Sequence, residues 1–463
     1  MIRVRMAPSP TGYFHIGSVR TTLYNWLFAK KNKGVFILRI EDTDKERNRK
    51  EFEEDILKNL EILDLKPDEL YRQSERTDFY TDHLEKLIKE DRAYYCFCTK
   101  EELEAEKKAM EEKGMAPKYS GKCASLDKEE AEKRVKSGEA YVIRLRVPEG
   151  KISFTDMIRG EVEFDAGLMG DVIIARNLKE PLYNFSVVID DILMKISHVI
   201  RGEEHLPNTP KQLVIYNALN AKPPLFAHLP LLLNKDRSKM SKRYGDVAVK
   251  DYLERGYLPE ALINFVALLG WHPQGNQEIF SREELINEFD ISRVQKAGAV
   301  FDIEKLNWIN RQYIAGLLEE DLTAKIEKYI PEEWKINQAM VRAIKPRLDK
   351  IGDVKELLMV YFELPEYDKN LLFWKGEDRD TKNILEKLAA EIGNIKDEEF
   401  DLETVTEKIT ALVPDDKKGD YLWPLRVSLS GSKTSPTPFE LLAGLGKDES
   451  LRRIKIAIGK LNG

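Results

Sequence analysis

The sequence predicts an α/β protein whose parallel sheet is interrupted by an inserted module and followed by an all-helical C-terminal region. Strand-like and helix-like segments alternate in residues 1–85 and again in 182–250, which is typical of a parallel sheet covered by helices. Between them, residues 86–181 mix charged helices with strand-like segments. From about residue 251 onward helical patterns dominate. The 463 residues are 42% apolar, which is enough for several packed cores.

The first strand and the first helix are joined by an unusual loop. The short apolar strand MIRV runs into RMAPSPTGYFHIGSVR at 5–20, and we expect a helix after Ser18 because the apolar residues that follow have helical spacing. Two prolines, two glycines and a histidine fill this join. The next strand, VFILRI at 35–40, precedes a long polar-faced helix that begins near Lys45.

The inserted module is expected to begin with charged helical structure. The helix KEELEAEKKAMEEKG should start at a capping box of Thr99 and Glu102, and the strand-like segments AYVIRLRVPEG and EVEFDAG follow it. Alternation then resumes with FSVVIDDIL, HVIRG, the helix NTPKQLVIYNALNA and the strand-like FAHLPLLL. One sheet is therefore split in the sequence by the insert.

The C-terminal third is predicted to be helical throughout. Ile384, Leu388 and Ile392 form one apolar stripe at helical spacing, and SPTPFELLAGLG carries a capping box that begins at Thr437. Composition excludes other classes of protein. The formal charge of −7 gives no overall basic signature, so a nucleic acid would have to meet a local patch.

Location can also be predicted from composition. Arginines and prolines interrupt the apolar start of the chain, and no segment has the roughly 18 apolar residues that a membrane span needs. Only three cysteines are present, so a disulfide framework is not expected. We therefore expect a cytoplasmic protein without membrane association.

Two motifs carry candidate chemistry. A glycine-bearing turn between a strand and a helix favours anions, and FHIGSVR places His15 and Gly17 there. Taken alone, this segment is more typical of an ordinary turn with a surface histidine. However, KMSKR at 239–243 puts two lysines, a serine and an arginine on a loop beyond a second strand. The pair of motifs together indicates a site for nucleotide phosphates.

These motifs resemble the HIGH and KMSKS signatures of class I aminoacyl-tRNA synthetases. The closer resemblance is to bacterial-type glutamyl-tRNA synthetases, through APSPTGYFHIG, RIEDTD, YNFSVVIDD, VIRGEEHL and KMSKR, and it extends through FDIEKLNWIN into the helical region. Ser18 replaces the last histidine of HIGH and Arg243 replaces the last serine of KMSKS, as in the glutamyl branch. The substitution at Ser18 removes one expected histidine contact to ATP.

The resemblance implies a division of the chain into domains. Residues 1–85 and 182–250 would form the two halves of a Rossmann-type catalytic domain, and 86–181 would be the connective insert that binds the acceptor stem. A helical domain at 251–318 would contact the tRNA stem, and helical domains within 319–463 would bind the anticodon. The implied partners are L-glutamate and tRNA(Glu), and we expect a monomer.

The implied reaction has two steps. Glutamate attacks the α-phosphorus of ATP to form glutamyl-adenylate, and the terminal adenosine of tRNA, by class resemblance through its 2′-hydroxyl, then takes the glutamyl group. Alignment and positive charge at the phosphates are what this chemistry needs, with Mg²⁺ on the ATP. His15, Lys239 and Lys242 are the expected catalytic residues. The resemblance implies ATP-binding roles for His15, Gly17, Ser18, Glu204, Leu232, Lys239, Met240, Ser241, Lys242 and Arg243.

Glutamate needs cations for two carboxylates and an anion for its ammonium group. Arg5 and Arg201 lie at the ends of strand-like segments, and each can offer a bidentate fork to a carboxylate. Glu41, at the end of another strand, resembles the family's ligand for the amine, and the resemblance adds Ala7, Ser9, Tyr183 and Asn184 to the pocket. We assign Arg5 to the side-chain carboxylate and Arg201 to the α-carboxylate, although the sequence leaves this division open.

The cysteines suggest a metal site in the insert. Cys96 and Cys98 would point to the same face of a strand, and Cys123 lies beyond the charged helix. Two thiolates two residues apart can join a tetrahedral Zn²⁺ if the strand bends, although only three cysteines are present and no histidine is near them. The pattern resembles a zinc site that some family members carry, with Tyr119 or water as the fourth ligand. The alternative is three thiols without a metal.

Three alternatives concern the choice of tRNA and the activity itself. Arg347 matches the position at which the family reads the third anticodon base, which favours an enzyme specific for tRNA(Glu). A non-discriminating enzyme would also charge tRNA(Gln). A non-catalytic tRNA-binding protein on the same scaffold would not need the ATP and glutamate groups. Glutaminyl enzymes end in β-barrels, so the helical C-terminal region argues against that branch.

Overall fold

The computed structural model describes residues 1–44, 46–240 and 248–462. The described chain forms two compact units. The first consists of residues 1–251 and 263–302, and the second consists of 252–262 and 303–463. Segment 263–302 thus packs with the first unit, although the sequence alone placed it within the helical segment 251–318. In the described parts of the chain, no helix is both long and apolar enough to cross a membrane.

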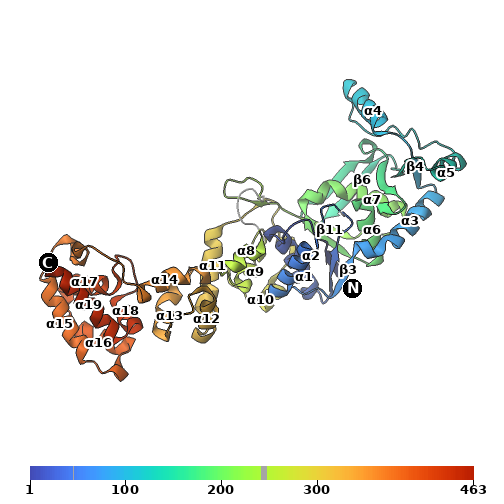
Figure 1. Ribbon diagram of the computed structural model, residues 1–463. Coiled ribbons are helices and arrows are strands. Elements are labelled where there is room, and N and C mark those ends of the chain that lie inside the picture. Colours follow the sequence, from blue (N-terminus) through green and yellow to red (C-terminus); the bar gives the residue numbers. More distant parts are fainter. Residues whose placement is uncertain (45, 241–247, 463) are drawn as a thin grey trace. The chain divides into compact units, whose positions relative to one another are not determined.

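The first unit is built on parallel strands (Figure 1). Strands β1 and β3 both pair in parallel with β2, which lies between them, and β10 pairs in parallel with β11. The two groups meet beside β1, where the backbone N–H of Ser197 donates to the carbonyl of Arg3 over 2.9 Å. The bounds are β1 Arg3–Met6, β2 Val35–Ile40, β3 Glu69–Arg72, β10 His198–Gly202 and β11 Leu225–Leu229. The predicted parallel sheet, divided in the sequence, is confirmed.

Helices bury their apolar faces against these strands. Helix α1 packs against β1, β2 and β10, and ten of its residues are buried, among them Val19, Leu23 and Leu27. Helices α3, α6 and α7 share one hydrophobic core with the antiparallel strands of the insert. The helices of this part are α1 Ile16–Lys31, α2 Lys50–Ile62, α3 Thr77–Lys89, α6 Tyr183–Leu193 and α7 Thr209–Ala218.

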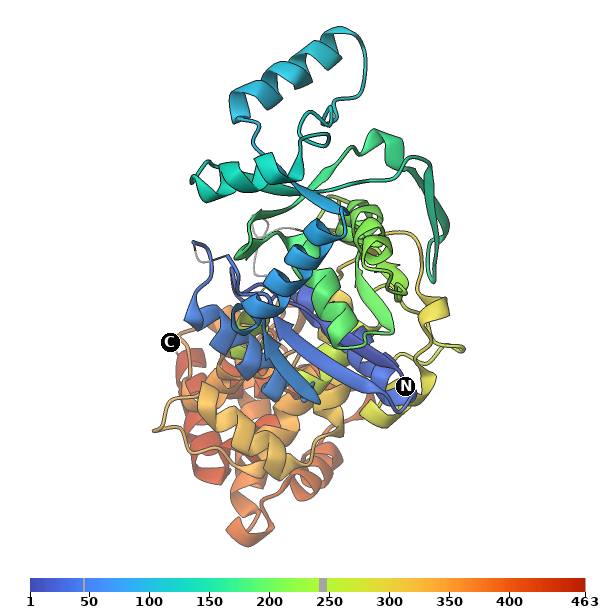
Figure 2. The same ribbon diagram turned by 90° about the vertical axis from the view of Figure 1, so that its right-hand side faces the viewer.

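The insert contributes an antiparallel sheet and a separate hairpin. Strands β4, β5, β8 and β9 form the sheet, and β6 and β7 form the hairpin, whose strand β6 also pairs in parallel with β11. Helix α4 buries no residue and projects from the insert in both views (Figures 1 and 2). Its predicted capping box of Thr99 and Glu102 is present. The bounds are β4 Ala93–Cys96, α4 Lys100–Glu112, α5 Lys128–Lys136, β5 Val142–Leu145, β6 Lys151–Asp156, β7 Gly160–Asp165, β8 Val172–Asn177 and β9 Glu180–Pro181.

Short elements follow the parallel strands. Strand β12 pairs in parallel with β13, and α10 packs against α1. The predicted strand FAHLPLLL is therefore two strands, β11 and β12, separated by Pro230, which lacks the N–H that a continuous ladder would use. The bounds are β12 Leu232–Leu233, α8 Val249–Glu254, α9 Pro259–Ala267, α10 Arg282–Glu288 and β13 Ala299–Val300.

The second unit is helical, as predicted. Helix α15 packs against α17 and α19, and the stripe Ile384, Leu388 and Ile392 is buried. Thr437 caps α18 in a capping box with Glu440. The helices are α11 Ile303–Gly316, α12 Glu319–Ile326, α13 Gln338–Ile344, α14 Val354–Phe362, α15 Thr381–Asn394, α16 Leu402–Leu412, α17 Lys418–Ser430, α18 Pro438–Leu445 and α19 Lys447–Leu461.

Candidate active site

A cavity of about 460 Å³ opens at the carboxyl ends of β1, β2 and β10. This is the edge at which open parallel sheets bind their ligands. The rigid loop after β1, the first turn of α1 and the segment after β12 complete its walls. The lining includes these predicted site residues: Arg5, Ala7, Ser9, His15, Gly17, Ser18, Glu41, Tyr183, Arg201, Glu204, Leu232, Lys239 and Met240.

Helix α1 begins at Ile16, earlier than predicted, because His15 is its N-cap. The backbone N–H of Ser18 donates to Nδ1 of His15 over 3.2 Å, and the hydroxyl of Ser18 lies 3.1 Å from Nε2. A Cβ at Gly17 would come within 3.1 Å of the imidazole, which explains the glycine. The ring therefore sits over a helix N-terminus, where backbone N–H groups and the helix dipole favour an anion.

The segment after β12 turns back along the cavity. Lys239 forms an antiparallel bridge with Leu233, and the backbone N–H of Met240 donates to the carbonyl of Leu232 over 3.0 Å. These contacts bring the first two residues of KMSKR into the cavity wall. The remaining predicted residues of this motif, Ser241, Lys242 and Arg243, lie outside the described residues.

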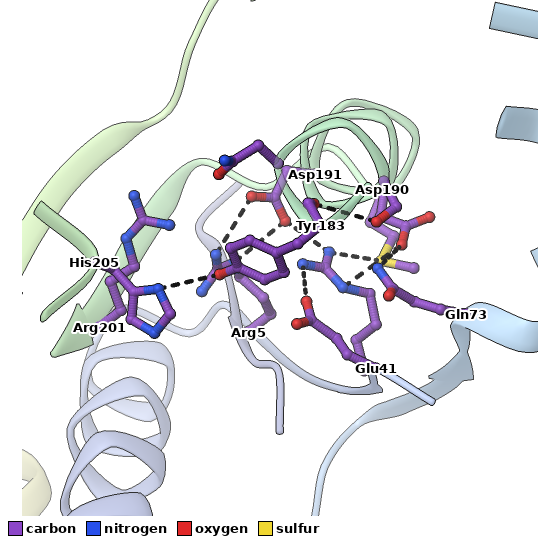
Figure 3. Close-up of polar contacts among 12 residues, drawn as sticks. Arg5, Glu41, Gln73, Tyr183, Asp190, Asp191, Arg201 and His205 are labelled. Carbon is purple, nitrogen blue, oxygen red and sulfur yellow. Dashed lines mark hydrogen bonds and ion pairs between the residues drawn. The ribbon is translucent and has the colours of Figure 1, made fainter. Parts of the chain in front are cut away.

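Two buried guanidinium groups share the carboxylate of Asp191 on α6. Arg5 donates to it through Nε and Nη2 at 3.2 and 3.4 Å (Figure 3). Arg39 donates to it through Nη1 at 2.7 Å. All three side chains are less than a twentieth exposed. Burial acts to raise the pKa of Asp191, but the charges of Arg5 and Arg39 outweigh it and hold that pKa below its usual value.

The neighbouring carboxylate, Asp190, lies 3.7 Å from Nε of Arg39 and also binds groups that do not contact Asp191. It accepts hydrogen bonds from Nε2 of Gln73 at 2.8 Å, from Nε of Arg76 at 2.7 Å and from the hydroxyl of Tyr80 at 2.8 Å. Asp190 and Asp191 thus fasten α6 to two different parts of the unit. Because Tyr183 is the first residue of α6, these contacts also fix one wall of the cavity.

Glu41 lies at the end of β2 with little access to solvent. Its Oε1 is 3.2 Å from Nη2 of Arg39, and the residue is 6% exposed. Burial raises the pKa of Glu41 to about 7, even though Arg39 and Arg5 act to lower it. Burial therefore opposes ionisation of this carboxyl group, and a cation in the cavity would stabilise its charged form.

Arg201 is fixed by three side chains at the end of β10. Its Nε donates to Nε2 of His228 over 3.3 Å, and its Nη2 donates to Thr209 and Gln212, each over 2.9 Å. Its Nη1 is buried and has no hydrogen-bond partner among the described residues. Because Arg201 lines the cavity, Nη1 is the nitrogen that this group can offer to a ligand.

The two arginines use the same edge to contact the protein. The Nε and Nη2 edge, which makes a side-on bidentate fork, faces Asp191 in Arg5 and faces Thr209 and His228 in Arg201. One of the edges at which each guanidinium could bind a carboxylate is thus used by protein groups. A carboxylate in the cavity would meet the Nη1 ends, because the other edge is used to hold each guanidinium in place.

Tyr183 and Asn184 have different positions at the start of α6. The hydroxyl of Tyr183 lies 3.2 Å from Nδ1 of His205, and burial followed by the charge of Arg201 lowers the pKa of His205 to about 4. Asn184 is absent from the lining formed by the described residues, and its Oδ1 accepts from Nε2 of Gln212 over 3.0 Å. It therefore contacts Gln212, one of the residues that hold Arg201.

Several polar residues that organise the cavity were not singled out from the sequence. Arg39 lies within the apolar strand VFILRI, Asp190 and Asp191 within the apolar helix FSVVIDDIL, and His228 within FAHLPLLL. Charged or polar residues in buried segments need partners, because burying an unpaired charge is very costly. This signal is present in the sequence, but it does not say which residues will pair.

The three cysteines of the insert meet at one point. Their Sγ atoms lie within 4.8 Å of one another, and the hydroxyl of Tyr119 is 3.4 Å from Cys96 and 3.5 Å from Cys98. Four ligands at about 2.3 Å around zinc would hold sulfur atoms roughly 3.8 Å apart, so this donor set fits the ion. The prediction that Cys96 and Cys98 lie on the same face of one strand is wrong, because β4 ends at Cys96 and Cys98 follows the strand.

Arg347, in the second unit, is held by an ion pair. Its Nη1 and Nη2 lie 3.2 and 3.0 Å from the carboxylate oxygens of Glu440, which also belongs to the capping box of α18. The side chain of Arg347 is 33% exposed. A ligand at this guanidinium would therefore compete with Glu440.

Comparisons with known proteins agree with this arrangement. A model of the catalytic domain of class I tRNA synthetases (E and Q) matches residues 1–308, and an anticodon-binding-domain model matches residues 314–458. The chain is 44% identical to a glutamate--tRNA ligase of Carboxydothermus hydrogenoformans, over 98% of this chain and 99% of that protein. It is 47% identical to one of Hydrogenobaculum sp., over 80% and 81% of the two chains.

Solved structures give the same picture. A crystal structure of a glutamate tRNA ligase from Elizabethkingia meningosepticum, in complex with its amino acid, has a TM-score of 0.90 and 36% identity. Each chain is covered to 99%. A glutamate-tRNA synthetase from Elizabethkingia anophelis has a TM-score of 0.88, with the same identity and coverage.

We expect Asp191→Asn to lower the free energy of unfolding by about 3 kcal/mol or more, because the buried Arg5 and Arg39 lose their shared counter-charge. Urea unfolding of the full chain, followed by tryptophan fluorescence, measures this change. Asp82→Asn on the exposed face of α3 is the matched control and should change stability by less than about 0.5 kcal/mol. Equal effects of the two substitutions would contradict a central role for Asp191.

Proposed function

The chain belongs to the class I tRNA synthetases of the glutamate and glutamine group, and on this premise we propose how its residues carry out the reaction. The activity is the ATP-dependent attachment of glutamate to tRNA, through glutamyl-adenylate and then transfer to the terminal adenosine. One observation supports the residue assignments most strongly. The cavity combines Nη1 of a buried arginine, a buried carboxyl group and a helix N-terminus.

Arg201 and Arg5 are proposed to bind the two carboxylates of glutamate. Nη1 of Arg201 is buried without a partner, so a substrate carboxylate would satisfy it, and we assign the α-carboxylate to it. Arg5 would meet the side-chain carboxylate, while Asp191 holds the rest of its guanidinium. Glu41 would receive the ammonium group, with Ala7, Ser9 and Tyr183 in the wall and Asn184 acting through Gln212.

Adenylate formation is proposed to depend on positioning and charge. The substrate carboxylate attacks the α-phosphorus of ATP and pyrophosphate leaves, so negative charge develops at the phosphates. His15 and the amide of Gly17 would face the phosphates from the start of α1, with Ser18 beside them as the residue whose backbone N–H holds the imidazole. Lys239 and Lys242 would stabilise the leaving pyrophosphate. Glu204, Leu232, Met240, Ser241 and Arg243 complete the proposed nucleotide site.

Enzymes of this class use Mg²⁺ with ATP, and the ion offsets phosphate charge when it is bound. The chain's own contribution is a cavity already lined by cations, which would orient the nucleotide. The domain roles expected from the sequence are retained as part of the proposal: residues 86–181 for the acceptor end, 251–318 for the stem and 319–463 for the anticodon. A monomer in the cytoplasm is also proposed, and the three unpaired cysteines support the latter.

Cys96, Cys98 and Cys123 are proposed to hold one structural Zn²⁺ in the insert, with Tyr119 or water as the fourth ligand. We expect about one zinc ion per chain in the purified protein, measured by atomic emission, and loss of most of it in Cys98→Ser. Tyr119→Phe distinguishes between Tyr119 and water as the fourth ligand, because the substitution lowers zinc affinity only if the phenol oxygen coordinates the ion. Absence of zinc from the wild-type protein, even after refolding with the metal, would favour three metal-free thiols.

The pKa of Glu41 predicts how substrate binding depends on pH. Only the ionised carboxylate attracts the ammonium group, so KM for glutamate should fall by up to about tenfold as pH rises from 6 to 8 through that pKa. The stability of the fold depends on pH in the opposite direction. Because the pKa of Glu41 is raised in the folded state, the protonated group adds to the free energy of unfolding at low pH, and this contribution is lost as pH rises through about 7. In Glu41→Gln, KM should be higher and nearly independent of pH. A wild-type KM without this trend, while KM for ATP stays constant, would contradict the assignment.

The function itself is tested by charging purified tRNA(Glu) and tRNA(Gln) in parallel with labelled glutamate, ATP and Mg²⁺. We propose that the enzyme discriminates, with Arg347 reading the third anticodon base, and expect tRNA(Glu) to be charged at least about 100-fold more efficiently. Arg347→Ala should reduce this ratio, whereas Arg342→Ala on the exposed side of α13 should leave it unchanged. Equal charging of both tRNAs would establish a non-discriminating enzyme. Charging of neither, with competent tRNAs, would overturn the catalytic role.

A further inference from the structure

Behind the cavity, the fully buried histidine that contacts Arg201 is paired with a buried carboxylate, and this carboxylate has no part in the function described so far. Nδ1 of His228, on β11, is 2.6 Å from Oδ2 of Asp156, and both side chains are 0% exposed. Asp156 is the last residue of β6, so it comes from the hairpin of the insert, where β6 pairs with β11 at Phe226. Neither His228 nor Asp156 lines the cavity formed by the described residues.

The protonation of this pair is set by its neighbours. The carboxylate of Asp156 also accepts from the backbone N–H groups of Ile158 at 2.9 Å and Arg159 at 2.8 Å, so it is surrounded by donors. Nδ1 of His228 must therefore carry a proton that it donates to Asp156. Burial lowers the pKa of His228, so the ring is neutral and Nε2 is left as an acceptor.

The acceptor side of the imidazole faces Arg201. Nε2 of His228 lies 3.3 Å from Nε of Arg201, a nitrogen that can only donate, and 3.0 Å from the hydroxyl of Thr209. A second ring proton on Nε2 would point at the guanidinium and repel it. The neutral ring with its proton on Nδ1 is thus the only form that suits both Asp156 and Arg201.

These contacts decide where the guanidinium of Arg201 can point. His228 holds Nε, while Thr209 and Gln212 hold Nη2, and the ring of Phe226 lies 5.6 Å below the guanidinium carbon. A planar group fixed at two of its three nitrogens has one orientation, and its third nitrogen is the unpartnered Nη1.

We propose that His228, oriented by Asp156, is a positioning residue that fixes Arg201 for the carboxylate of the amino-acid substrate. This inference rests on the proposed function, in which Arg201 binds that carboxylate. The insert would then contribute Asp156 to amino-acid binding, in addition to its proposed contact with the acceptor end.

Two substitutions of His228 each keep one of its two contacts, the one with Arg201 or the one with Asp156, and remove the other. The carbonyl of Gln can reach the position of Nε2 and accept from Arg201, whereas the amide of Asn can reach Asp156 but leaves Nε of Arg201 without an acceptor. We expect KM for glutamate to rise about tenfold in His228→Asn and by about threefold or less in His228→Gln. KM for ATP and kcat should change little in either variant.

The matched control is His198→Asn. His198 is another buried histidine, three residues before Arg201 on β10, whose Nδ1 lies 2.9 Å from the hydroxyl of Ser197. We expect this control to lower the melting temperature without changing KM for glutamate. Equal changes in KM for the Asn and Gln variants of His228, or a parallel rise in KM for ATP, would indicate a general packing role and overturn the proposal.

A double-mutant cycle separates this inference from the assignment on which it rests. Arg201→Lys alone should raise KM for glutamate, and adding His228→Asn should raise it no further, because His228 acts through Arg201. An additive effect would overturn the positioning role. An unchanged KM for glutamate in Arg201→Lys would instead show that Arg201 does not bind the substrate carboxylate, and the positioning role of His228 would then be overturned as well. If His228→Asn fails to fold, the isosteric Asp156→Asn replaces it, with a severalfold rise in KM expected and an unchanged KM contradicting the proposal.

Discussion

The sharing of Asp191 by Arg5 and Arg39 is the interaction on which the rest of the site depends. Two guanidinium groups side by side in a dry interior repel each other, and a carboxylate between them converts that repulsion into attraction. The three residues come from β1, β2 and α6, so the same ion cluster that neutralises charge also fixes three elements relative to one another. Without it, the carboxyl ends of β1 and β2 would not define a cavity of fixed shape.

This arrangement has a chemical consequence for the choice of amino acid. The cavity wall carries arginines whose donors cannot accept a hydrogen bond, so a group that can accept on two oxygens is favoured over one that also brings donors. Glutamine would bring an amide N–H₂ to guanidinium groups, which can only donate. If Arg5 and Arg201 bind the substrate carboxylates as proposed, they therefore favour a side-chain carboxylate over an amide, while Glu41 offers a buried carboxyl group to the ammonium group.

Much of the fold and part of the site could be predicted from the sequence. Periodicity and capping residues predicted the split parallel sheet and the helical C-terminal unit, because both depend on local patterns. The motif residues His15 and Lys239 were also identified and lie in one cavity. The pairing of Arg39 with Asp191, and of His228 with Asp156, joins residues more than 70 positions apart, so no local pattern specifies it. Likewise, Arg5 is held by Asp191, 186 positions away, so no local pattern shows which edge of its guanidinium the protein uses.

The hairpin β6–β7 makes the insert less separable than its position in the sequence suggests. Strand β6 pairs with β11 at one position, Phe226 with Asp156, and supplies the buried side chain of Asp156, so residues 86–181 are not independent of the sheet. Excising them would remove both this pairing and the carboxylate that His228 contacts. The hairpin therefore belongs structurally to the sheet, although it lies within the insert in the sequence. An exchange of inserts, natural or engineered, would have to keep the hairpin even if it replaced the rest of residues 86–181.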